Sequence, residues 1–115
     1  EVHILKNDVA AGKLFFKNTE VKWFLSTNSK YLPNEFIKKN IPSLRSMRFN
    51  NEKIEFSKGI ANLHDNCYKD FIKNKGYRLN DYKKCFELVS QIKKCKTRTN
   101  SVNHHPYLEK IIYGK

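Results

Sequence analysis

Two adjacent histidines followed by a proline, His104-His105-Pro106, are the residues of this sequence best suited to chemistry. Near neutral pH an imidazole donates or accepts a proton with little bias, so a histidine pair suits general acid–base catalysis. Pro106 favours an extended backbone at His105 and would make the turn rigid. The simpler interpretation is structural, with one histidine facing solvent and the other capping the preceding helix. For a histidine pair taken alone, the structural interpretation is favoured.

A zinc site is the second chemistry that the sequence raises. His64 and Cys67 have H-x-x-C spacing and could join the histidine pair around the metal. Closed zinc sites usually have two tightly spaced ligand pairs, whereas this sequence has one loose pair, so we expect no metal. The three cysteines, which are Cys67, Cys85 and Cys95, form no C-x-x-C pair. Their odd number disfavours a disulfide framework and indicates a reducing compartment, cytoplasmic or nuclear.

The composition indicates one small, strongly basic domain. The 115 residues leave no room for a second independent core, and 23 Lys and Arg against 11 Asp and Glu give a net charge of +12. This charge makes affinity for polyanions plausible, but the lysines occur in separated pairs without an RNA-binding or helix-turn-helix signature. Nucleic-acid binding therefore rests on charge only. No apolar run is long enough to cross a membrane, so we expect no membrane association.

The first half of the chain reads as β structure followed by a short helix. Short apolar runs and one alternating run predict strands within residues 1–28, with turns at Gly12 and Asn18. Residues 32–46 predict a helix that begins near Pro33, although Pro42 should kink or end it.

The second half predicts one clear helix among shorter elements. We expect a strand at Ile54 and Phe56 with a turn at Gly59, then an insertion or short helix, and a return strand over residues 70–79. Residues 81–95 predict a helix capped by Asn80. Its apolar stripe contains Tyr82, Cys85, Phe86, Leu88, Val89 and Ile92. A polar loop then leads to a final strand that starts at Tyr107.

The region around the histidine pair resembles a known signature. Asn100, three residues, His104-His105-Pro106, six residues and Tyr113 resemble the motif of the pterin-4a-carbinolamine dehydratases. Two upstream segments, "LPNEFIKKNIPSLRSMRF" and "GYRLNDYKKCFELVSQI", are similar to the first helix of that family and to its strand that leads into a long helix. The resemblance covers about residues 32–115, preceded by a β-rich segment over 1–28. The family's third histidine has no counterpart in these residues.

The resemblance implies an α+β fold with an antiparallel sheet and helices packed on one face, in a homodimer or homotetramer. It implies dehydration of a 4a-hydroxytetrahydropterin to the quinonoid dihydropterin, without a metal or redox cofactor. His104 and His105 would share the acid and base roles, while Asn100, Pro106 and Tyr107 would contact the pterin. Two alternatives stay open. One is a non-catalytic family member that binds a protein partner, and the other is a basic nucleic-acid-binding protein.

Overall fold

The computed structural model describes residues 1–57, 62–98, 100 and 102–114. These residues form two compact units. The sheet unit contains Glu1–Tyr31 and Lys84–Lys115, and the hairpin unit contains Leu32–Lys83. Gly59, predicted to lie in a turn, is outside the described residues.

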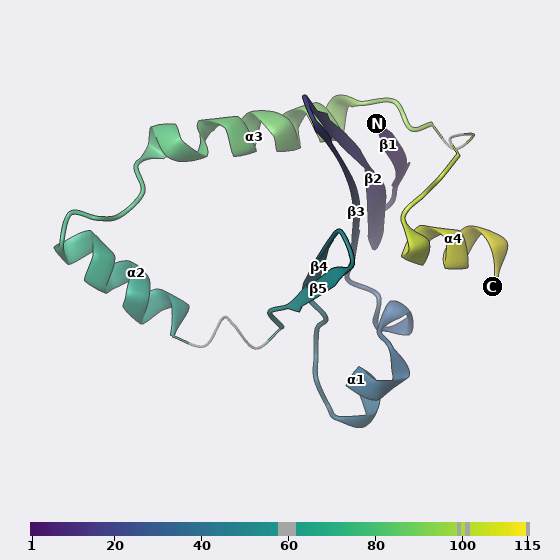
Figure 1. The fold of residues 1–115 in the computed structure, drawn as a ribbon, viewed down its shortest axis with the longest axis horizontal. Coiled ribbons are helices and arrows are strands. Elements are labelled where there is room, and N and C mark those ends of the chain that lie inside the picture. Colours follow the sequence, from purple (N-terminus) through teal and green to yellow (C-terminus); the bar gives the residue numbers. More distant parts are fainter. Residues whose placement is uncertain (58–61, 99, 101, 115) are drawn as a thin grey trace. The chain divides into compact units, whose positions relative to one another are not determined.

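The sheet unit is built on an antiparallel meander of three strands in the order β1-β2-β3 (Figure 1). The strands are β1 (Val2–Leu5), β2 (Val9–Phe16) and β3 (Thr19–Ser26). The β structure predicted for residues 1–28 is therefore confirmed, as is the turn at Asn18. Gly12 lies inside β2 opposite Trp23, so the turn predicted there is wrong. A Cβ at Gly12 would lie 2.2 Å from the Glu1 carbonyl oxygen, and this close approach explains the glycine.

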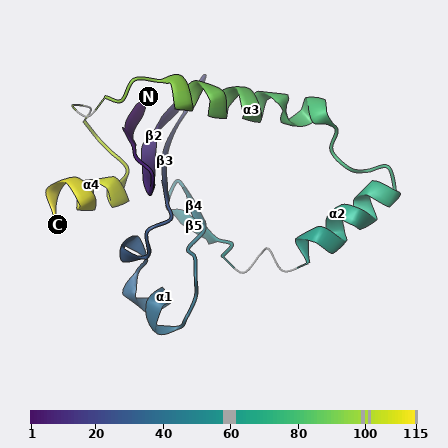
Figure 2. The same ribbon diagram turned by 180° about the vertical axis from the view of Figure 1, so that it is seen from behind.

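A small core forms where one face of the sheet is covered. Val9, Ala11 and Lys13 alternate along β2 onto the same face, and all three are buried. Leu108, from the last helix, is fully buried. That helix is α4 (Pro106–Tyr113), which lies beside the sheet in Figure 1. Figure 2 shows the same arrangement from behind.

The strand predicted to start at Tyr107 is therefore wrong, because this segment is helical. Pro106 occupies the first helical turn, where its missing N–H and fixed φ favour a helix. The Nδ1 atom of His105 accepts a hydrogen bond from the Tyr107 backbone N–H at 3.2 Å and so caps the helix start. At the other end, Gly114 adopts φ 64°, a left-handed conformation common after a helix.

The long helix predicted over residues 81–95 is confirmed as α3 (Leu79–Lys94). Asn80 lies inside it and is not its cap. Instead, a carboxylate oxygen of Asp81 accepts a hydrogen bond from the Arg78 backbone N–H at 2.7 Å. The predicted apolar stripe is present, but its large side chains Phe86 and Val89 are 65% and 50% exposed.

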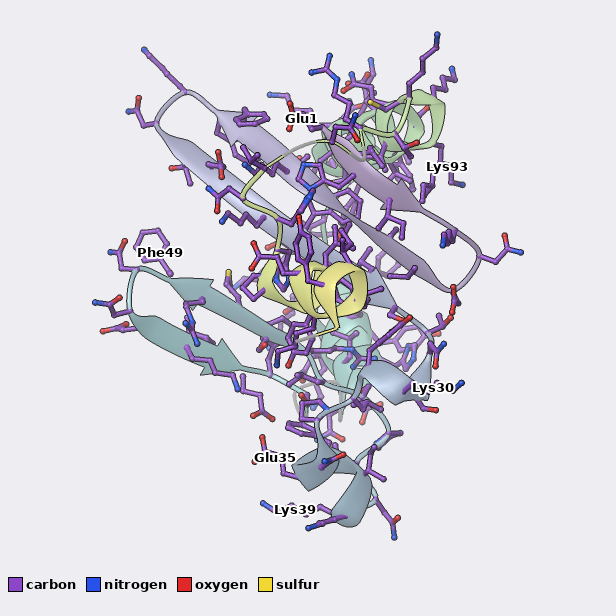
Figure 3. All side chains as sticks on the ribbon, turned by 90° about the vertical axis from the view of Figure 1, so that its right-hand side faces the viewer. Glu1, Lys30, Glu35, Lys39, Phe49 and Lys93 are labelled. Carbon is purple, nitrogen blue, oxygen red and sulfur yellow. The ribbon has the colours of Figure 1, made fainter. Side chains whose placement is uncertain are left out.

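In the hairpin unit, the helix predicted over residues 32–46 is much shorter. It is α1 (Asn34–Lys38), which ends well before Pro42, as a proline requires. A hairpin follows, made of β4 (Ser46–Phe49) and β5 (Glu52–Glu55), and Figure 3 shows Phe49 at its tip. The predicted strand at Ile54 is confirmed within β5.

The return strand predicted over residues 70–79 is wrong. Its first residues belong to α2 (Leu63–Ile72), and the residues from Lys73 to Arg78 form turns and irregular structure before α3. Asn74 turns the chain with φ 54° after the helix end. α2 has no buried residue. None of the described helices is long and apolar enough to cross a membrane.

Candidate functional site

The histidine pair is brought to the sheet by the segment that precedes α4. The Arg98 backbone N–H donates to the Val2 carbonyl at 2.8 Å, and Thr97 forms an isolated parallel bridge with Val2. Further along, the Asn103 side-chain oxygen accepts a hydrogen bond from the Lys22 ammonium on β3. These contacts tie both ends of the segment to the sheet. They place His104 over β1.

His104 is buried against a histidine that the sequence did not indicate. The two residues are 3% and 2% exposed, and the ring of His104 lies at a steep angle to that of His3. The two Nδ1 atoms are 2.9 Å apart, within hydrogen-bond distance. Burial, followed by the charge of His3, lowers the pKa of His104 below its usual value, because both disfavour the imidazolium.

His3 links this pair to a carboxylate. Its Nε2 atom lies 3.4 Å from a carboxylate oxygen of Glu1. The hydrogen bond with His3 lowers the pKa of Glu1, because it stabilises the carboxylate form. The same carboxylate is 3.4 Å from the Arg98 guanidinium.

His105 has different neighbours from those of His104. Its ring stacks on Phe24 of β3 and on Tyr107, with centroid distances of 5.7 and 5.8 Å. Burial, followed by the charge of Lys22, lowers the pKa of His105. The two histidines therefore contact different partners.

The other residues predicted for the site are Pro106, Tyr107 and Asn100. Pro106 begins α4, and Tyr107 stacks on Phe24 with a centroid distance of 5.6 Å. Within the described part of the chain, no hydrogen bond joins Asn100 to either histidine. The structure thus brings the rings of His105 and Tyr107 into contact, and the role of Asn100 in the site stays a prediction.

The group most suited to binding a ligand is an aromatic cluster formed by Phe24, Tyr31, His105 and Tyr107. Phe24 is at its centre, and Tyr31 meets it edge-on with a centroid distance of 6.2 Å. One cation, the Lys110 ammonium, lies 5.4 Å from the centre of the Tyr107 ring. Lys22 precedes Phe24 by two residues on β3, so the two side chains share a face of the sheet, and the charge of Lys22 contributes to the lowered pKa of His105. Stacked rings beside ammonium groups suit a ligand that is planar in one part and anionic in another.

Sequence reasoning missed His3, Lys22 and Phe24. His3 and His104 are 101 residues apart in the sequence, so no local spacing could pair them. For Lys22 and Phe24 the sequence did contain a weak signal, because the alternation along β3 places these two residues on one face of the sheet and Trp23 on the other.

Among the described residues, no group of three or more His, Cys, Asp and Glu side chains could hold a metal ion. The three cysteines are free and exposed. In the hairpin unit a hollow of about 210 Å³ is lined by Glu35, Phe36, Lys39, Ile41 and Glu55. Figure 3 labels two of these residues, Glu35 on α1 and Lys39 directly after it. This volume is below that of usual small-molecule sites.

The structure of this chain is similar to part of a known dehydrogenase. No family model matches the sequence. The crystal structure of the WlbA (WbpB) dehydrogenase from Thermus thermophilus, in complex with NAD and α-ketoglutarate, has a TM-score of 0.83 at 27% identity. The same dehydrogenase in complex with NAD and UDP-GlcNAcA has a TM-score of 0.82, also at 27% identity. In both comparisons the match covers 93% of this chain, which spans about a third of the dehydrogenase (35% and 34%).

This similarity corrects the prediction made from the histidine motif. The resemblance to pterin-4a-carbinolamine dehydratases is wrong, because the matching fold is that of a dehydrogenase. The predicted pterin dehydration, catalysed by a hydro-lyase, is wrong for the same reason, and neither alternative function is better supported. The coarser expectation of an α+β protein with antiparallel sheets is confirmed. The single domain, the homodimer or homotetramer and the protein partner stay predictions.

Proposed function

We propose that this chain, with its two antiparallel sheets, forms part of a dehydrogenase that acts on an anionic nucleotide sugar. The observation that carries this proposal is the TM-score of 0.83 over 93% of the chain, together with 27% identity, to a dehydrogenase whose structures contain NAD and either α-ketoglutarate or UDP-GlcNAcA. A part of a dehydrogenase can contribute substrate contacts, subunit contacts or both. The residue types of this chain indicate which ligand it is suited to bind.

The chain itself does not fit NAD. Dinucleotide sites use a G-x-G-x-x-G turn between a strand and a helix in a parallel βαβ unit. The four glycines of the sequence, Gly12, Gly59, Gly76 and Gly114, do not have this spacing, and all strand pairs in the two described sheets are antiparallel. The dinucleotide would therefore be bound by residues outside these 115, and no step of hydride transfer is assigned to this chain.

The chain is better suited to the sugar nucleotide. Its net charge of +12 favours anions, and the diphosphate of a nucleotide sugar is anionic. The aromatic cluster offers ring faces for a nucleobase, since stacking of a base on an aromatic side chain is favourable for every base. Lys22 and Lys110 stand beside these rings and supply positive charge for phosphate groups. We assign to this cluster the contact with the nucleotide end of the substrate.

Amide NMR titration of the complete chain with UDP, UDP-GlcNAcA and NAD tests this assignment. We expect UDP and UDP-GlcNAcA to shift the amides near Phe24, His105 and Tyr107, and NAD to shift them much less. Lys22→Ala should weaken binding of UDP by about 10- to 150-fold, because a hydrogen bond to a charged group contributes about 1.5–3 kcal/mol.

Lys69→Ala is the matched control, because Lys69 lies on the exposed helix α2 in the hairpin unit. It should leave UDP binding unchanged. Shifts that spread evenly over all lysine-rich surfaces, or equal losses in the two variants, would show attraction by net charge alone. Either result would overturn the assignment to the aromatic cluster.

A further inference from the structure

Two imidazoles buried side by side join β1 to the segment that leads into α4. His3 and His104 are each almost inaccessible to solvent, and their Nδ1 atoms face each other at 2.9 Å. A hydrogen bond on this line needs one Nδ1 that carries a proton and one that does not. The contact therefore depends on the number of protons that the two rings hold.

The partners of His3 decide the arrangement of protons when both rings are neutral. Its Nε2 atom faces the Glu1 carboxylate at 3.4 Å, which can only accept a hydrogen bond, so Nε2 carries the proton of His3. The Nδ1 atom of His3 is then an acceptor, and the Nδ1–H group of His104 is the donor. A directed chain runs from His104 through His3 to Glu1.

Adding one proton to each ring breaks this series of hydrogen bonds. With both rings protonated, two N–H groups point at each other across 2.9 Å, and two positive charges lie in a buried site. A singly protonated pair can still share one proton between the Nδ1 atoms. The contact is compatible with zero or one added proton and incompatible with two.

The charges around the pair act in both directions. Glu109 of α4 favours the charged form of His104, and on the other side of the pair the Arg98 guanidinium lies 3.4 Å from the Glu1 carboxylate. Lys13 of β2 and Lys22 of β3 disfavour protonation of His104. Burial is the largest influence on the pKa of His104, which is lowered from the ordinary value of 6.5. His105, the neighbour in the sequence, also has a lowered pKa.

We propose that the His3–His104 pair is an acid-sensitive latch, which holds the segment entering α4 against β1 and releases it when both rings are protonated. The direction follows from proton linkage. Because the pKa of His104 is lower in the folded state, its contribution to stability is complete above pH of about 6.5 and is lost as the pH falls toward the lowered value. This proposal is independent of the proposed dehydrogenase function.

The imidazole nitrogens of the wild-type chain give the first test. Long-range ¹H–¹⁵N NMR at pH 7.5 should show a protonated Nδ1 in His104 and an unprotonated Nδ1 in His3. Two unprotonated Nδ1 atoms would overturn the latch, because no hydrogen bond could then join the rings. This measurement needs no variant and does not depend on whether a variant folds.

Amide hydrogen exchange measured from pH 7.5 to 5 gives the second test. Protection factors at Leu108 and Ile111 of α4 should fall by about tenfold per pH unit for each proton taken up on release, while those at Ala11 of β2 fall later. His104→Gln keeps a donor but does not titrate, so it should remove this fall.

The control is His64→Gln on the exposed helix α2, which should behave as the wild type does. Protection in α4 that does not change with pH in the wild type would overturn the latch. The same fall in His104→Gln as in the wild type would also overturn it.

Discussion

Replacing Gly12 by alanine should destabilise the sheet unit far more than an ordinary exchange of glycine for alanine. The new Cβ would lie 2.2 Å from the Glu1 carbonyl oxygen and 2.9 Å from Cζ2 of Trp23, whereas ordinary contacts begin near 3.4 Å. Glu1 is held by two backbone hydrogen bonds with Lys13, one in each direction, both 2.9 Å long. The Cβ can be accommodated only if Glu1 moves away, which breaks this pairing.

The magnitude follows from those two effects. Forcing an extra methyl group into a packed site destabilises by about 1–3 kcal/mol. Each lost backbone hydrogen bond adds about 0.5–1.5 kcal/mol, so the two bonds and the overpacking together give about 2–6 kcal/mol. Urea denaturation followed by Trp23 fluorescence measures this change as a lower midpoint with an unchanged slope.

Gly76→Ala is the matched control for Gly12→Ala. Its Cβ would meet Phe71 no closer than 3.6 Å, an ordinary contact, so this substitution should be neutral or stabilise by about 0.4–1 kcal/mol. Equal denaturation midpoints for Gly12→Ala and the wild type would refute the close approach of Glu1 to β2.

Three further substitutions test other parts of the fold. Leu108→Ala should lower the free energy of unfolding by about 2–5 kcal/mol, because it empties a fully buried site. Ile112, which is 47% exposed, is the control, and Ile112→Ala should lower that free energy much less. Similar losses for the two variants in urea denaturation would contradict the core position of Leu108. Asp81→Ala should lower the free energy of unfolding by about 0.5–1.5 kcal/mol and reduce the helical circular dichroism signal. Asp81→Asn keeps an acceptor for the Arg78 N–H, so it should lower the free energy of unfolding less. Gly114→Ala should cost about 1–2 kcal/mol from its left-handed φ of 64°, and a neutral result would show that α4 ends differently.

The regular elements with clear periodicity could be predicted from the sequence. Alternation around Trp23 gave the strand β3, and the apolar spacing of residues 82–92 gave α3. Proline chemistry also worked at Pro42, where α1 has already ended. These successes share one cause, because each depends on interactions between residues close in the sequence.

The errors arose where the decisive partner is distant or the segment is short. Eight residues of α4 offered too few apolar positions to separate a helix from a strand, and the buried Leu108 is explained only by the sheet that it packs on. α2 has no buried residue, so its helical pattern carried no clear apolar face. His3 could not be paired with His104 because the chain between them spans nearly the whole sequence.

The histidine motif misled because its residues have local structural roles. His105 caps α4 through Nδ1 and Pro106 occupies the first turn, so these two residue types are favoured at this helix start whatever the protein does. The simpler interpretation also needs correction, since His105 caps the helix that follows it, and His104 is buried. A short motif that fits a helix start is weak evidence of catalysis.

Formation of NADH tests the central claim most directly. The complete gene product that contains this chain would be incubated with NAD and UDP-GlcNAcA, and the absorbance of NADH would be followed. We expect NADH to form with UDP-GlcNAcA, and Lys22→Ala to raise KM for the nucleotide sugar while KM for NAD stays unchanged. No NADH with UDP-GlcNAcA or related nucleotide sugars, from a protein that is folded and binds NAD, would contradict the proposed function.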